Sequence, residues 1–349
     1  MNRGIILLPL LGILLLFSIL CGCSFGPMKI SLASTIHSCL EPLEISYMDS
    51  LPTKIESMVI WDIRFPRVLL GVLVGSSLAV AGALMQGLFR NPLADPGIIG
   101  VTSGGAVGAS IMIVLGSMIV GDEFVDTLGA FAIPLAAITG AFMVTLLIYR
   151  LSLIGEHVDI VSMLLIGIAI NALAGALIGI IVFMATDEEV RTLTFWGLGS
   201  LARGDWHMLS CAAPFFVIPL LFVSIFSKSL NALLLGEEEA MHLGIEVSKL
   251  KKILILTTAS LVGAAVSLTG SIGFIALVVP HIIRSIATSD HRLLLPAAGL
   301  LGASLLVLSD IVARTLVSPA ELPIGILTAL LGAPVFLSLL IRRKRQIFV

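Results

Sequence analysis

The chain alternates between long apolar stretches and short polar segments. Each apolar stretch is close to the roughly 20 residues that a helix needs to cross the hydrocarbon core of a membrane. We therefore predict a membrane-spanning helix in each of them. They occupy residues 4–25, 68–89, 96–121, 127–149, 160–186, 208–227, 293–316 and 322–341, of which only 293–316 contains charges, namely Asp310 and Arg314.

One further apolar stretch, residues 253–283, contains no charge but is too long for one comfortable span. Its middle reads "SLTGSIGF" (267–274), where Gly270 and Gly273 favour a sharp turn. One helix here gives nine spans, and two give ten. With ten spans, thirteen of the 20 Lys and Arg residues fall on the cytoplasmic side, as the positive-inside rule requires. We therefore predict ten spans with both termini cytoplasmic.

The composition supports this interpretation, because 58% of the residues are hydrophobic and only 12% are charged. Soluble domains carry about 25% charged residues, and a soluble chain this apolar would expose large aggregation-prone patches. The sequence thus predicts an all-α polytopic membrane protein, with residues 1–349 as a single transmembrane domain. A net charge of −2 gives no reason to expect nucleic-acid binding.

The first apolar stretch follows Arg3, as in a signal peptide. Because it is long enough for a full crossing, we favour a retained first helix. Two longer polar segments connect the spans: residues 26–65, predicted outside, and residues 228–252, predicted inside. Both are too short to bury a core of their own.

Signatures of enzymes are missing from the sequence. It contains no H-E-x-x-H, no G-x-S-x-G and no phosphate-binding G-x-x-x-x-G-K-[ST]. Its four cysteines lack metal-ligand spacing. We therefore expect no catalytic residue, metal or cofactor in this chain.

Charged residues within or beside the spans are the candidates for function, because ionisable groups in lipid are costly. Asp310 and Arg314 lie four residues apart, on one helical face, where they can neutralise each other. Arg64 and Arg67 flank Pro66 where the second span begins. They fit either an interfacial anchor or a docking patch for an acidic partner, and their spacing does not decide between the two.

Two polar segments on the predicted cytoplasmic side also stand out. "FRNPLADPGIIG" (89–100) places two prolines between spans, where the chain must turn. "EEEAMHLGIEV" (237–247) is a short acidic segment in which Glu239 and Ala240 precede Gly244.

Several stretches together resemble the FecCD-type permeases, the membrane subunits of ABC importers for iron siderophores, haem and cobalamin. They are "RFPRVLLGVLVGSSLAVAGALMQGLFRNPLADPGIIGVTSGGAVGA", "GSIGFIALVVPHIIR", "DHRLLLPAAGLLGASLLVLSDIVAR" and "ELPIGILTALLGAPVFLSLL", and they cover about residues 60–342 in order. The resemblance implies a type II ABC importer permease fold of ten helices in the bacterial inner membrane. It also implies a second permease subunit, expected to be a second copy of this chain, two cytoplasmic ATPase subunits, and a periplasmic or lipid-anchored binding protein.

The resemblance further implies roles for particular residues. Arg64, Arg67 and Arg314 would dock the binding protein, with Asp310 holding Arg314 in place. Asn91 and Leu93 would narrow the cytoplasmic end of the path, although an ordinary tight turn explains them as well. The segment of Glu239, Ala240 and Gly244 would contact the ATPase.

The substrate is suggested by "ATDEEVRTLTFWGLGSL" (185–201), which resembles the haem-importing branch of the family. We therefore expect haem, with ferric siderophores and then cobalamin as alternatives. A secondary transporter driven by an ion gradient is the alternative of another class. It would need a titrating carboxylate in a span, for which Asp310 is the candidate.

Overall fold

The computed structural model describes residues 2–40, 53–155 and 157–347, so residues 41–52 of the predicted external loop lie outside the described part. The described chain is almost entirely helical, apart from one short antiparallel hairpin of β1 and β2. The elements are α1 (Asn2–Ser24), α2 (Leu32–Leu40), α3 (Lys54–Met58), η2 (Val59–Arg64), α4 (Phe65–Leu88), η3 (Pro96–Ile99), α5 (Val101–Ser110), η4 (Ile111–Leu115), α6 (Gly116–Val120), α7 (Asp122–Leu128), η5 (Gly129–Phe131), α8 (Ala132–Leu151), β1 (Leu153–Ile154), β2 (His157–Val158), α9 (Ile160–Met184), α10 (Asp187–Gly197), α11 (Trp206–Phe222), η6 (Val223–Phe226), α12 (Ser227–Leu233), α13 (Glu237–His242), α14 (Val247–Thr269), α15 (Ile275–Ile286), α16 (His291–Thr315) and α17 (Ile324–Ile347).

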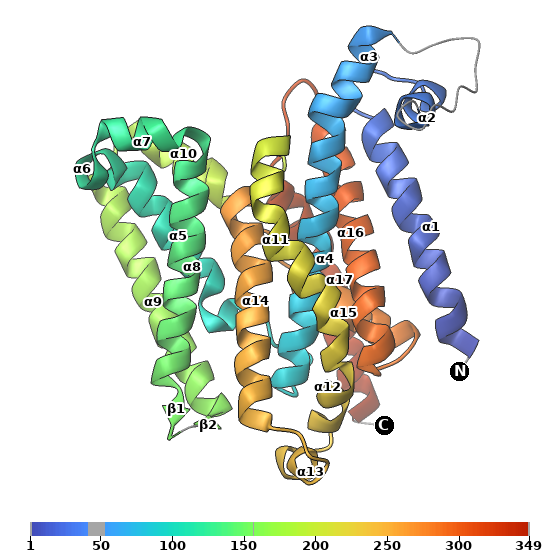
Figure 1. The fold of residues 1–349 in the computed structure, drawn as a ribbon, viewed down its shortest axis with the longest axis vertical. Coiled ribbons are helices and arrows are strands. Elements are labelled where there is room, and N and C mark those ends of the chain that lie inside the picture. Colours follow the sequence, from blue (N-terminus) through green and yellow to red (C-terminus); the bar gives the residue numbers. More distant parts are fainter. Residues whose placement is uncertain (1, 41–52, 156, 348–349) are drawn as a thin grey trace.

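The chain is a multi-pass membrane protein. Among the described residues, eight helical segments are long and apolar enough to cross a membrane, and two shorter apolar helices, Ile275–Ile286 and Ile324–Ser338, accompany them. These ten segments match the ten predicted spans one for one, while the number that cross the bilayer stays a prediction. In Figure 1, α1 begins and α17 ends toward the end of the molecule that carries α13, whereas α2 and α3 lie at the opposite end. Which end faces the cytoplasm also stays a prediction.

The predicted break in the long apolar stretch 253–283 is confirmed. Helix α14 ends at Thr269 and α15 begins at Ile275. Gly270 between them has a φ of +72°, and a Cβ at this position would lie 1.9 Å from the carbonyl oxygen of Trp196. Only glycine fits both the backbone conformation and the space, and the chain therefore turns where the sequence places Gly270.

The helix of the second span begins earlier than predicted, at Lys54 rather than residue 68, and runs without interruption to Leu88. Thr53 and Glu56 form a capping box at its start. Pro66 does not start the helix as expected, because the π-helical turn η2 precedes it and the Phe65 amide donates to the Ile60 carbonyl, five residues back. A proline lacks an amide hydrogen, and the wider turn accommodates it inside a continuous helix.

Helix α4 forms the centre of the bundle, and α16, α14 and α15 pack around it (Figure 1). It approaches α16 closely at Gly75 and Gly302, where a Cβ on either residue would lie 2.4 Å from the other's carbonyl oxygen. Small residues allow such contacts between membrane helices. Helix α1 packs against α16. Its retention in the mature protein stays a prediction.

The predicted cytoplasmic loop, residues 228–252, is mostly helical. Helix α12 continues the α11 segment to Leu233, α13 is a separate short helix, and α14 already begins at Val247. Charged residues in this segment ended the predicted span too early, because helices continue beyond the hydrocarbon region.

Candidate functional site

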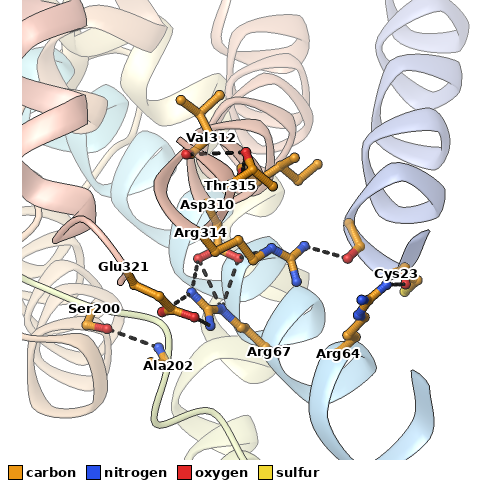
Figure 2. A network of polar contacts seen from close by, with 12 residues as sticks. Cys23, Arg64, Arg67, Ser200, Ala202, Asp310, Val312, Arg314, Thr315 and Glu321 are labelled. Carbon is orange, nitrogen blue, oxygen red and sulfur yellow. Dashed lines mark hydrogen bonds and ion pairs between the residues drawn. The ribbon is translucent and has the colours of Figure 1, made fainter. Parts of the chain in front are cut away.

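Figure 2 shows the three predicted docking residues close together: Arg64 ends η2, directly after α3, Arg67 lies in the first turn of α4, and Arg314 lies in the last turn of α16. Their relative exposures are only 3%, 8% and 3%. Asp310 of α16 and Glu321, on the connection to α17, complete this arginine cluster (Figure 2). The sequence separates these residues by up to 257 positions, and the α4–α16 contact brings them together.

Arg67 holds both carboxylates of the cluster. Its Nη2 lies 2.8 Å from Asp310 Oδ1, and its Nε lies 3.1 Å from both oxygens of Asp310. Its Nη1 and Nη2 each lie 2.9 Å from an oxygen of Glu321. This is the forked geometry that makes arginine–carboxylate pairs strong and directional.

The two other arginines donate hydrogen bonds to backbone carbonyls at the end of α1. Arg64 donates to the carbonyl oxygens of Cys23, at 2.8 Å, of Ser24 and of Met28. Arg314 donates to the carbonyl oxygen of Gly22. The last carbonyls of a helix lack partners within it and carry its negative partial charge, so both guanidiniums satisfy α1 and fix it to α4 and α16.

The expected pairing of Asp310 with Arg314 is confirmed as an ion pair, in which the Nε of Arg314 lies 3.5 Å from Asp310 Oδ2. Arg67 lies nearer to Asp310, at 2.8 Å. The four-residue spacing could not show this second partner, since Arg67 comes from another helix. Glu321 was not singled out by the sequence, although it begins the quoted stretch "ELPIGILTALL". Its hydrogen bonds with Arg67 hold the pKa of its carboxyl below the usual range.

Asn91 and Leu93 lie in the turn that follows α4. Arg90 has a φ of +48°, and the Asn91 amide donates to the Gln86 carbonyl at 3.1 Å. The Asn91 side chain accepts from the Leu93 amide at 3.0 Å, which is an Asx turn. Both residues are exposed. The turn itself is thus explained by local hydrogen bonds, and a role for it in gating stays a prediction.

The predicted ATPase segment forms α13 and its flanking turns. Ala240 is fully buried, Glu239 is exposed, and Gly244 ends the helix with a φ of +82°. Glu237 forms an ion pair of 2.7 Å with Lys251 of α14, whose ammonium also donates to the Val158 carbonyl at 3.0 Å. Anchored in this way, the segment exposes four large apolar side chains, those of Leu234, Leu235, Met241 and Leu243.

The described residues contain no group of three or more His, Cys, Asp or Glu side chains placed to hold a metal ion. Cys21, Cys23, Cys39 and Cys211 are free thiols.

A family model, curated relatives and a solved structure all indicate the same family of permeases. The model of the FecCD transport family matches residues 14–342. The hemin transport system permease protein of Yersinia pestis is 45% identical over 82% of this chain and 84% of its own length. A vitamin B12 import system permease protein of Klebsiella pneumoniae is 42% identical over 82% and 83% of the two chains.

A solved structure is similar over nearly the whole fold. It shows an inward-facing conformation of a protein assigned to the metal-chelate type of ABC transporter, with a TM-score of 0.82 and 32% identity over 96% of this chain and 98% of that one. Family and fold therefore agree with the polytopic architecture and its placement in the bacterial inner membrane. This chain belongs to the FecCD transport family and is a permease of an ABC importer.

Proposed function

We propose that the chain forms the translocation path for haem, as one of two identical permease subunits. The 45% identity to a hemin permease over 82% of the chain carries this proposal. ATP would be hydrolysed by two separate cytoplasmic subunits, and a periplasmic or lipid-anchored binding protein would deliver the substrate. The similarity to vitamin B12 permeases, at 42% identity, makes cobalamin a competing substrate, and ferric siderophores remain another.

Reconstitution into liposomes tests the substrate and the energy source together. The permease, its ATPase and its binding protein would be supplied with haem, a ferric siderophore or cobalamin, with and without ATP. We expect ATP-dependent uptake of haem. Preferred uptake of another ligand would overturn the substrate, and uptake driven by an ion gradient without ATP would overturn the ABC mechanism. The carboxylate of Asp310 is paired with Arg67 at 2.8 Å and with Arg314 at 3.5 Å, so it is not an unpaired carboxylate within a span.

We infer that the arginine cluster docks the binding protein through its rim. Arg67 is buried, but its partner Glu321 keeps 34% of its side chain exposed, and carboxylates of an approaching protein would compete with Glu321 for the same guanidinium. The cluster has three arginines for two carboxylates, and this excess positive charge favours an acidic partner.

Charge reversal tests docking. Arg67→Glu should weaken binding of the binding protein at least about tenfold, because a buried charge pair becomes a repulsive one. Arg292→Glu is the matched control, since Arg292 is exposed and lies in the first turn of α16, at the opposite end of that helix from Arg314. Thermal unfolding of both variants would establish that they are folded. Unchanged affinity of a folded Arg67→Glu protein at low salt would contradict docking at this cluster.

We propose that α13, with Glu239, Ala240 and Gly244, contacts the ATPase. The exposed apolar side chains of α13 and its flanking turns form the kind of surface that a partner covers. Rigid-body movement of the ATPase subunits would then act on the permease through α13.

Cysteine crosslinking tests both the dimer and the proposed inner gate. Asn91→Cys or Leu93→Cys would be introduced in a Cys211→Ser background, since Cys211 is exposed. We expect a disulfide between the two permease subunits in the state closed toward the cytoplasm. A dimer that never forms this crosslink in any nucleotide state would show that residues 91 and 93 form an ordinary turn.

A further inference from the structure

An apolar cavity lies between α8, α11 and α14, away from the arginine cluster and from α13. It has a volume of about 570 Å³, within the range of roughly 300–1,000 Å³ typical of small-molecule sites. Helix α14 packs against both α8 and α11, and Figure 1 shows the three helices next to one another. Residues of all three helices line the cavity, most of them on α8; Leu146 of α8 and Leu256 of α14 are among them.

Its two charged residues lie at one end and have the same sign. Arg150 is in the last turn of α8, and Lys252 is in the second turn of α14. Both helices reach there the end of the molecule that carries α13 and the β-hairpin (Figure 1). The phenol of Tyr149 lines the cavity at the same level, as tyrosines do at membrane interfaces.

Neither cation has a carboxylate partner among the residues that the structure describes. Of the acidic residues nearby, Glu237 pairs with Lys251 at 2.7 Å and Glu246 with Lys249 at 3.6 Å, while Asp159 accepts from the Ser162 amide at 2.8 Å. Arg150 and Lys252 are both exposed, so an external anion can reach them.

The length of the cavity matches one leaflet of a bilayer. Its lining on α8 runs from Ile138 to Arg150, which at 1.5 Å per residue is about 18 Å. Half of a hydrocarbon core is about 15 Å thick. Thr145 also lines the cavity, more than one helical turn before Arg150 on α8. Its buried hydroxyl has no hydrogen-bond partner.

We propose that this cavity binds an anionic glycerophospholipid, with one acyl chain between α8 and α11 and the phosphate between Arg150 and Lys252. Basic pockets between membrane helices on the cytoplasmic side recognise anionic head groups in this way. The single sign of the charges selects anionic over zwitterionic lipids, and the apolar walls select a chain over a soluble phosphate.

Native mass spectrometry of the purified full-length permease tests the site, with added phosphatidylglycerol or phosphatidylcholine of identical acyl chains. The wild-type protein should retain phosphatidylglycerol preferentially. Arg150→Gln with Lys252→Gln should weaken its binding about 30-fold, or roughly fivefold for each charge. Lys228→Gln with Arg292→Gln, which removes two exposed cations outside the cavity, is the matched control and should change nothing.

A second variant separates the chain from the head group. Leu256→Trp, at a 45% exposed position in the cavity wall, should reduce binding of both lipids by filling the space. Equal retention of the two lipids by wild type, or undiminished phosphatidylglycerol binding by the double glutamine variant, would overturn the proposal. So would a crosslink between two copies through Leu146→Cys, which would show that a second chain occupies the cavity.

Discussion

The arginine cluster and the α13 segment, at opposite ends of the molecule, differ in which side chains they bury and which they expose. In the arginine cluster, the three arginines and Asp310 are buried, and each contacts a group of the same chain. At α13 and its flanking turns, three of four large apolar side chains are more than half exposed. Both ends were predicted to bind partners. The comparison teaches that a partner at the first end must compete with intramolecular contacts, whereas α13 is open to one.

The largest expected effect is on stability at the arginine cluster. Asp310→Ala should lower the free energy of unfolding by about 3–5 kcal/mol, because it leaves buried guanidiniums without their shared carboxylate. Thermal unfolding in detergent would measure the loss. The control is Asp62→Ala, since Asp62 is exposed in the same helix as Arg67, and it should unfold as wild type. Equal stability of the two variants would mean that the cluster is not an electrostatic unit.

At α13 and its flanking turns, by contrast, we expect substitutions to weaken binding of the ATPase and to leave the stability of the permease unchanged. Leu235→Ser with Leu243→Ser should leave the unfolding temperature nearly unchanged, because both side chains are over 60% exposed. Association with the ATPase should weaken by at least about tenfold, since a buried leucine contributes roughly 1.5–3 kcal/mol. Co-purification titrations would measure this association. If the same variant lost stability and kept its partner, the contrast between the two ends would fail.

The smallest expected effect concerns pH. The pKa of Glu321 is lowered in the folded protein by its hydrogen bonds with Arg67. A lowered folded-state pKa stabilises the protein above the unfolded value of about 4.3, and this contribution disappears as the pH falls through the folded-state value. Because the carboxyl is partly exposed, we expect the contribution to stay below about 1 kcal/mol. The difference in unfolding temperature between wild type and Glu321→Gln, followed from pH 7 to pH 3, should shrink toward zero.

The sequence could predict what depends on neighbouring residues. Apolar length located the spans, and the glycine at position 270 located the break, because span length and backbone conformation are local properties. The motifs also singled out Arg64, Arg67 and Arg314 as docking residues. The structure places the three in one cluster, while docking itself stays a prediction.

The partners of these arginines could not be predicted in the same way. The pairing of Asp310 with Arg67 depends on the packing of α16 against α4, whereas periodicity within one helix can indicate only the pair of Asp310 with Arg314. The capping of α1 by two guanidiniums involves backbone carbonyls, which leave no trace in residue types. The sequence also did not predict that the second helix begins at Lys54. A proline usually marks the start of a helix, but here the π-helical turn η2 lets the helix continue through Pro66.

The ammonium of Lys251 has a mechanical consequence. It holds Glu237 at the start of α13 and the Val158 carbonyl in the hairpin between α8 and α9. Lys251 thus links α13, α14 and the hairpin at a single point, the Lys251 pivot. A displacement of α13 would therefore act on two elements. It would act on α14 directly through Lys251, and on the start of α9 through Val158 and Asp159. If the pivot holds, α13 and the start of α9 move as one body, and spin labels at the exposed positions 238 and 161 would keep a constant separation through the ATP cycle.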